Sequence, residues 1–276
     1  IEDTLRYKLN LLNQKKDIKE SQSEPIEISF ISLRTNKIPL NNIDLRLAIA
    51  KSFNRELIRN KVSYSLRNSA SSLIPLILKK DSSVSWPDFN PKESKRIFKE
   101  QGYCDDNIFN LPLTYRSNVP TDKLIAFYWQ QSVKAEMKDC FSISINGVES
   151  TTIYKNLSEG IYPSVILDWT GAYSDPEAYL TPLLSCNKFI GNYCLRGESV
   201  FSGSFWASEK VQKLFKESEN LQGVERLNKL LQIEKIASKS LPYIPIWTSS
   251  QKAWSQNHIS KPIFNGAGII NMSELL

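Results

Sequence analysis

Apolar residues along the chain change repeatedly between the period of a strand and the period of a helix, which predicts an α/β fold. Alternating or fully apolar runs predict strands over 26–33, 111–116, 141–145, 164–168 and 242–249. Helical spacing predicts helices over 1–12, 45–58, 90–102, 122–138, 153–157, 208–219 and 223–240. The stretch 14–25, QKKDIKESQSEP, has neither period and is expected to be a polar linker.

The residues from 111 to 145 form a strand–helix–strand unit with short connections. Such a unit requires two parallel strands joined by a right-handed crossover. The chain shows no internal repeat, and its 276 residues allow one large domain or two modest ones.

The composition is that of an ordinary globular protein, with 41% hydrophobic and 23% charged residues. Basic residues give a net charge of +6, but they are scattered. Acidic residues interrupt even the densest basic cluster, 92–99, which indicates a solvated helix face, and we expect no nucleic-acid partner. No apolar run approaches the roughly 20 residues of a membrane span. Because the sequence begins with Ile1, we expect a processed product or one domain of a longer protein.

Residues that support catalysis or metal binding are scarce. His258 is the only histidine, no nucleophile motif accompanies it, and neither GxxxxGK nor GxGxxG occurs. The spacing of the cysteines does not fit a zinc knuckle. We therefore expect no enzyme, no metal and no cofactor. The four cysteines fit either two disulfides in an exported protein or four buried thiols in a cytosolic one.

Residues 166–185, ILDWTGAYSDPEAYLTPLLS, resemble the signature region of the family 5 extracellular solute-binding proteins. These are receptors for ABC importers of oligopeptides, dipeptides, nickel and related solutes. In that family a buried strand ends in Trp, and an acidic loop ends in Asp-Pro before a helix; here these are Trp169, Asp175 and Pro176. Four further pieces resemble the family in the same order: IEISFISLRTNKIPLNNIDLRLAIAKSFNRELI, NPKESKRIFKEQGY, FWASEKVQKLF and LPYIPIW.

The resemblance implies a periplasmic-binding-protein-like lobe of type II, with a mixed sheet flanked by helices. Residues 1–35 would be the end of lobe one and a hinge strand. Residues 36–247 would be lobe two, the α/β ligand-binding lobe, and residues 248–276 would return towards lobe one.

The resemblance also implies the solute-binding component of an ABC import system. Such a protein captures peptides or peptide-like solutes between two lobes and delivers them to a membrane permease. We expect a monomer in the periplasm or another extracytoplasmic location, with lipid anchoring of the full-length protein left open. The alternative is the ligand-sensing effector domain of a transcription regulator, since such modules also resemble this family.

The ligand-binding residues that the resemblance implies lie after the strand 164–168; they are Trp169, Thr170, Gly171, Ala172 and Tyr173. An indole and a phenol at the carboxyl edge of a sheet suit a desolvated site. Rim packing is the alternative role for the two aromatic residues.

Relatives also have a cysteine on either side of the loop that follows this segment, which implies a disulfide between Cys186 and Cys194. We expect Cys104 and Cys140 to form the second disulfide, because both precede strands that should be parallel neighbours.

One position departs from the family. The residue three after the signature Trp is commonly Asp in peptide-binding members, where it resembles a counter-ion for the amino terminus of the ligand. Here that residue is Ala172. Asp168 should point away from Trp169, and Asp175 should cap the helix that begins at Pro176. We therefore hypothesise a solute whose amino terminus is blocked, absent or bound elsewhere.

Overall fold

A computed structural model describes residues 3–14, 18–79 and 86–274 of the chain. Its centre is a six-stranded sheet with the order β3-β9-β2-β6-β4-β5. The strands are β2 (Glu27–Leu33), β3 (Asn68–Ser69), β4 (Phe109–Arg116), β5 (Phe141–Val148), β6 (Ser164–Thr170) and β9 (Tyr243–Ser249). The sheet is mixed and carries helices, which confirms the predicted α/β class.

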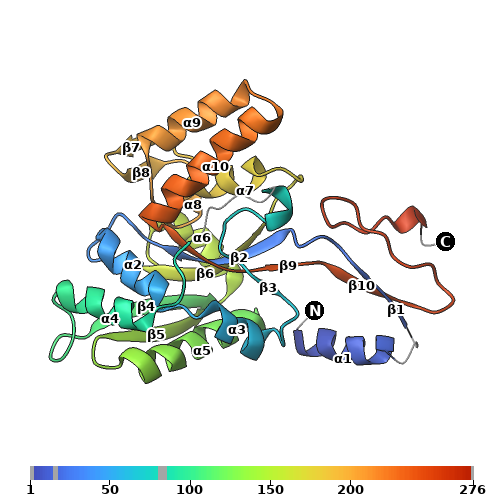
Figure 1. The fold of residues 1–276 in the computed structure, drawn as a ribbon, viewed down its shortest axis with the longest axis horizontal. Coiled ribbons are helices and arrows are strands. Elements are labelled where there is room, and N and C mark those ends of the chain that lie inside the picture. The colour runs from blue at the N-terminus through green and yellow to red at the C-terminus, as the bar shows by residue number, and fades with distance from the viewer. Residues whose placement is uncertain (1–2, 15–17, 80–85, 275–276) are drawn as a thin grey trace.

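Helices cover both faces of the sheet (Figure 1). One layer contains α3 (Arg55–Val62), α4 (Pro91–Glu100) and α5 (Pro120–Met137). The other contains α7 (Glu177–Leu184), α9 (Glu209–Glu219) and α10 (Gly223–Ser240). The shorter elements are α2 (Ile43–Lys51), which packs against α4, and α6 (Ser150–Asn156), α8 (Glu198–Phe201), η1 (Leu76–Leu78) and η2 (Leu157–Glu159).

The directions of the strands bring several strand ends to one edge of the sheet. Strands β4 and β5 are parallel and are joined through α5, as the sequence predicted. Strand β6 is parallel to β4, whereas β2 is antiparallel to both β6 and β9. The carboxyl ends of β4, β6 and β9 therefore lie at the same edge as the amino end of β2.

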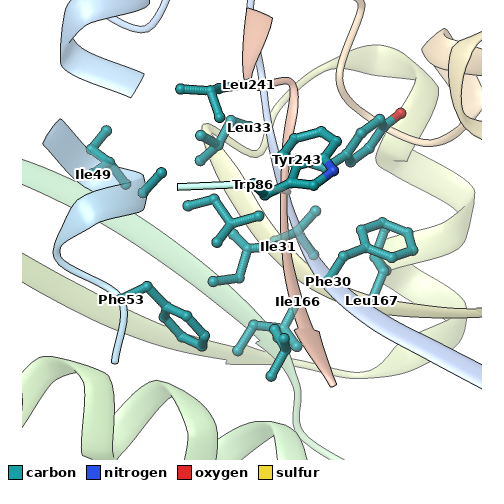
Figure 2. Packing of buried hydrophobic residues seen from close by; sticks show 14 of the residues in the cluster. Phe30, Ile31, Leu33, Ile49, Phe53, Trp86, Ile166, Leu167, Leu241 and Tyr243 are labelled. Atoms are coloured by element: carbon teal, nitrogen blue, oxygen red, sulfur yellow. The ribbon is translucent and has the colours of Figure 1, made fainter. Parts of the chain in front are cut away.

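The core lies on both sides of β2, whose successive side chains point to opposite layers of helices. Phe30 lies beside Leu167 and meets the Tyr243 ring edge-on, with centroids 5.2 Å apart (Figure 2). Ile31 lies on the other side with Ile49 and Phe53 (Figure 2). All six side chains are buried. The sequence of a strand that is buried on both faces is a nearly continuous apolar run, and residues 26–33 have such a sequence.

The predicted helix over 45–58 is wrong in one respect, because it is two helices. Helix α2 ends at Lys51, and α3 begins at Arg55 with Asn54 as its N-cap. The Asn54 Oδ1 accepts a hydrogen bond from Leu57 N at 2.9 Å. The apolar spacing continues across the break because Phe53 is also buried, so periodicity alone does not reveal it.

A two-stranded antiparallel ribbon extends away from the sheet. Strands β1 (Ile18–Gln22) and β10 (Lys252–Gln256) form it, and they continue β2 and β9 outwards. Helix α1 (Asp3–Gln14) and the tail with η3 (Met272–Glu274) lie on the same side of the molecule (Figure 1). The linker predicted over 14–25 is therefore wrong for 18–22, which form a strand. Residues 15–17 of that linker, and residues 1–2 of the first predicted helix, lie outside the described residues.

Two disulfides join the same cysteine pairs that the sequence suggested. Cys104–Cys140 links the segments that precede β4 and β5. Cys186–Cys194 closes the hairpin of β7 (Lys188–Ile190) and β8 (Tyr193–Arg196) after α7. All four cysteines are therefore paired.

The two disulfides should stabilise the fold to different extents. They close loops with sequence separations of 36 and 8, and the chain-entropy model gives about 4 and about 2.6 kcal/mol for such loops. We expect the C104S/C140S variant to lose more stability in urea unfolding than the C186S/C194S variant.

Thiol titration of the unfolded, unreduced protein should find no free thiol. Four reactive thiols would contradict both pairings.

Candidate ligand-binding site

A cavity of about 410 Å³ opens at the edge of the sheet where the strand ends meet. Open α/β sheets bind ligands outside the carboxyl ends of their strands, which is the position of this cavity. Its lining comes from α1, β2, β6 and β9, from the start of α5 and from the loops next to them. The residues that surround it are Arg6, Glu27, Ser29, Arg67, Asn118, Val119, Pro120, Thr121, Asp122, Asp168, Trp247 and Gln251, and Arg116 lies directly behind Asp122 and Asp168.

Arg116, the last residue of β4, holds two carboxylates together. Its Nε and Nη2 donate to the Asp122 carboxylate at 2.7 and 3.2 Å. Its Nη1 and Nη2 donate to Oδ1 and Oδ2 of Asp168 at 2.9 and 2.6 Å. Arg116 and Asp122 are buried, while 35% of the Asp168 side chain is exposed. The cluster has one excess negative charge, and Asp168 presents it to the cavity.

The protonation of this cluster follows from its burial. Burial raises the pKa of Asp122 to about 6, and the Asp168 charge adds to the rise, although the Arg116 guanidinium opposes it. Burial lowers the pKa of Arg116, but its hydrogen bonds to Asp168 and Asp122 more than offset this and raise the pKa above its ordinary value. Arg116 therefore stays charged, and Asp122 gains a proton as the pH falls below about 6.

The opposite wall of the cavity pairs a cation with an aromatic face. The Arg67 guanidinium carbon lies 4.7 Å from the centre of the Trp247 ring, and Arg67 Nη1 lies 3.8 Å from Glu27 Oε1. The indole N–H of Trp247 donates to Ser29 Oγ at 2.9 Å. These contacts fix Trp247 and Arg67 in place before a ligand arrives.

None of the five residues predicted to bind ligand lines this cavity. Two of them, Trp169 and Thr170, end β6, and the other three follow it. Trp169 is half-buried, and its indole N–H donates to the Ala178 carbonyl at 2.7 Å. Gly171 is buried, and a Cβ there would lie 2.7 Å from the Tyr179 ring. Thr170, Ala172 and Tyr173 are exposed. The loop adjoins the cavity through Asp168, which points to the other side of the strand from Trp169, as expected.

Residues 4–191 match the family described as bacterial extracellular solute-binding proteins, family 5 Middle. The chain belongs to this family.

Individual relatives of this family 5 protein are distant. The peptide transport periplasmic protein SapA of Salmonella typhimurium is 23% identical over 234 residues, which are 81% of this chain and 39% of SapA. Heme-binding protein A of Haemophilus influenzae is 25% identical over 231 residues, 82% of this chain and 40% of that protein. The chain therefore spans about two fifths of the length of these relatives.

A solved structure shares the fold of the family 5 chain. The dipeptide binding protein of Pseudoalteromonas sp. SM9913, in complex with Met-Leu, superposes with a TM-score of 0.78 at 21% identity. The match covers 97% of this chain and 52% of that one. None of the described helices is long and apolar enough to cross a membrane.

Sequence reasoning missed most residues that surround the cavity. The sequence pattern could have identified Arg116 and Asp122 as site residues. Arg116 is a charged residue at the end of a predicted strand, and Asp122 is an acid at the start of the next predicted helix. The pattern does not identify Arg67 and Trp247, since they are far apart in the sequence and meet only through the pairing of β3 with β9.

Removing the shared cation should destabilise the protein strongly and in a pH-dependent way. In Arg116→Met, Asp122 and Asp168 lose their partner, and we expect a loss of about 3–5 kcal/mol at pH 7. The loss should shrink at pH 5. Without Arg116 the folded-state pKa values of the two acids rise above their unfolded values, so protonation favours the folded state at low pH and this contribution disappears as the pH rises.

Urea unfolding of the native protein and the variant at pH 5 and pH 7 measures this loss. Arg116→Lys is the matched control, because it keeps the charge and should lose less stability. A difference between Arg116→Met and the native protein that does not change with pH would contradict the proposed role of the two carboxylates.

Proposed function

We propose that this chain forms one lobe and the hinge of a two-lobed receptor, the solute-binding component of an ABC import system. The family match over residues 4–191 carries the proposal. The receptor captures a peptide or peptide-like solute between its lobes and delivers it to a membrane permease. Guanidinium groups, carboxylates and an indole around one cavity support a solute with both polar and apolar parts.

The proposed division of the chain keeps residues 1–35 with lobe one and a hinge strand, 36–247 as lobe two, and 248–276 as the return segment. Two side-by-side connections leave the sheet as the β1–β10 ribbon, which is the arrangement that a hinge requires. Helix α1 supports this division. Its Leu5, Tyr7, Leu11 and Leu12 are 42–47% exposed, an apolar surface that the rest of lobe one would cover.

The proposed location is the periplasm or another extracytoplasmic compartment, where the receptor acts as a monomer. The two disulfides support it, because disulfides persist in oxidising compartments and are rare in the cytosol. Mass spectrometry of the amino terminus of the full-length protein tests for a lipid anchor.

Calorimetry with a peptide mixture tests the receptor function. We expect the complete two-lobed receptor to bind peptides and this 276-residue chain to bind the same peptides at least roughly tenfold more weakly, because the second wall that removes water is absent. Asp168→Asn, at the half-exposed acid of the cavity, should weaken binding by the complete receptor. A receptor that binds no peptide would contradict the function. Equal affinities would show that this lobe carries the whole site.

We also propose that the amino terminus of the solute is blocked, absent or bound elsewhere. Ala172 supplies no charge where the resemblance places Asp. The nearby acids already have partners. Both Asp168 oxygens accept from Arg116, so the excess negative charge that Asp168 presents to the cavity is shared within the Arg116 cluster and is not that of a free carboxylate. Asp175 accepts from Glu177 N at 2.8 Å and from Arg226 at 2.6 Å. A buried ammonium group without a partner would cost several kcal/mol.

Titration of the complete receptor with a peptide and its N-acetylated twin tests this preference. We expect the acetylated peptide to bind at least as tightly as the free one. Ala172→Asp should shift the preference towards the free amine, and Ala172→Asn, which adds similar volume without charge, should not. A strong preference of the unmodified receptor for the free amine would refute the proposal.

A further inference from the structure

A second cavity, of about 250 Å³, lies at the opposite edge of the sheet from the candidate site. It is bounded by the segment that follows β2, by the first residues of β4 and by Pro163, which precedes β6. Its walls are largely apolar: Leu40, Phe109 and Leu111 are buried, and Ile38 at the mouth is 84% exposed.

The cavity exists because two parallel strands start at different points. Strand β4 begins at Phe109, but it pairs with β6 only at Leu113 and Thr114. The first residues of β4 therefore have a strand neighbour on the β5 side alone. The backbone of Pro112 faces the side of β4 that has no strand neighbour here. Because proline has no N–H, no donor is left unpaired on that side. The Pro112 carbonyl accepts a hydrogen bond from Ser164 Oγ at 2.7 Å.

Two cations, Arg34 and Lys37, stand at this cavity. Within the described ranges, neither Arg34 nor Lys37 forms an ion pair. Arg34 Nε donates to Asn36 Oδ1 at 2.8 Å, and its guanidinium carbon lies 5.3 Å from the centre of the Phe205 ring. Burial lowers the pKa of Arg34. Lys37 is exposed beside it.

The Arg34 guanidinium is also held in position. A Cβ at Gly160 would lie 2.8 Å from Arg34 Cζ, so the guanidinium packs directly on this glycine. A positioned, partly desolvated cation binds a carboxylate more strongly than a freely hydrated one, because less hydration and less conformational freedom are lost on binding.

We propose that this cavity binds a small amphiphilic carboxylate. The hydrocarbon part would lie against the accessible apolar side chains Ile38, Pro112 and Pro163, above the buried Phe109 and Leu111. The carboxylate would meet Arg34 and Lys37. The volume is below the roughly 300–1,000 Å³ of sites for drug-sized ligands, which limits the occupant to a short chain or one ring. The site is independent of the solute site, from which the whole length of the sheet separates it.

Octanoate is a suitable probe, and octanol is its matched uncharged control. Titrations of the 276-residue chain by calorimetry and by methyl NMR should show saturable binding of octanoate, with shifts at Ile38 and Leu40. Octanol should bind roughly tenfold more weakly, because its hydroxyl carries no charge for Arg34 and Lys37 to pair with.

Two variants separate the proposed site from general hydrophobic binding. Arg34→Gln should weaken octanoate roughly tenfold and leave octanol unchanged. Lys37→Gln, at a surface position where folding is not at risk, should weaken octanoate by a smaller factor. Lys61→Gln, an exposed lysine on α3 away from the cavity, should change neither affinity. The proposal is overturned if octanoate does not saturate, if octanol binds equally well, or if the shifts occur near Trp247 instead.

Discussion

Strand β2 is the constraint on which the arrangement of this protein depends. It forms one antiparallel ladder with β6 and another with β9, so it joins a strand from the middle of the chain to one near its end. Because both faces of β2 are buried, a shift of its register by one residue would exchange the side chains of two packed layers. This fixed register places Glu27 and Ser29 beside Trp247 and Asp168, and the cavity follows from it.

The Arg116 cluster shows how the edge of the sheet tolerates buried charge. Two carboxylates close together would repel each other, and one of them would be protonated at neutral pH. A guanidinium that donates to both offsets this repulsion, and its planar fork suits two carboxylates at once. The cluster also ties the end of β4 to the end of β6 and to the start of α5. The charges that shape the cavity thus also hold its walls together.

Sequence patterns predicted the parts of this structure that depend on local information. The parallel unit from Leu111 to Ile145 has a strong strand–helix–strand pattern, and the segment around Trp169 is distinctive for its family. The β1–β10 ribbon could not be predicted, because its strands are polar and their pairing joins residues near 20 to residues near 254. The cavity was missed for a similar reason, since its lining is assembled by the order of strands in the sheet rather than by any motif.

The charges around the cavity bear on what a closed receptor would select. Arg6, Arg67 and Arg116 balance Glu27, Asp122 and Asp168, so this chain adds no net charge to the cavity. When a second lobe covers a cavity, water leaves and every remaining electrostatic interaction becomes stronger. A solute with a net charge would then need its counter-charge from the opposing wall, because the charges here already compensate one another. In the proposed receptor, this chain would therefore govern shape, aromatic contact and hydrogen bonding, and the sign of the preferred charge would depend on the other lobe.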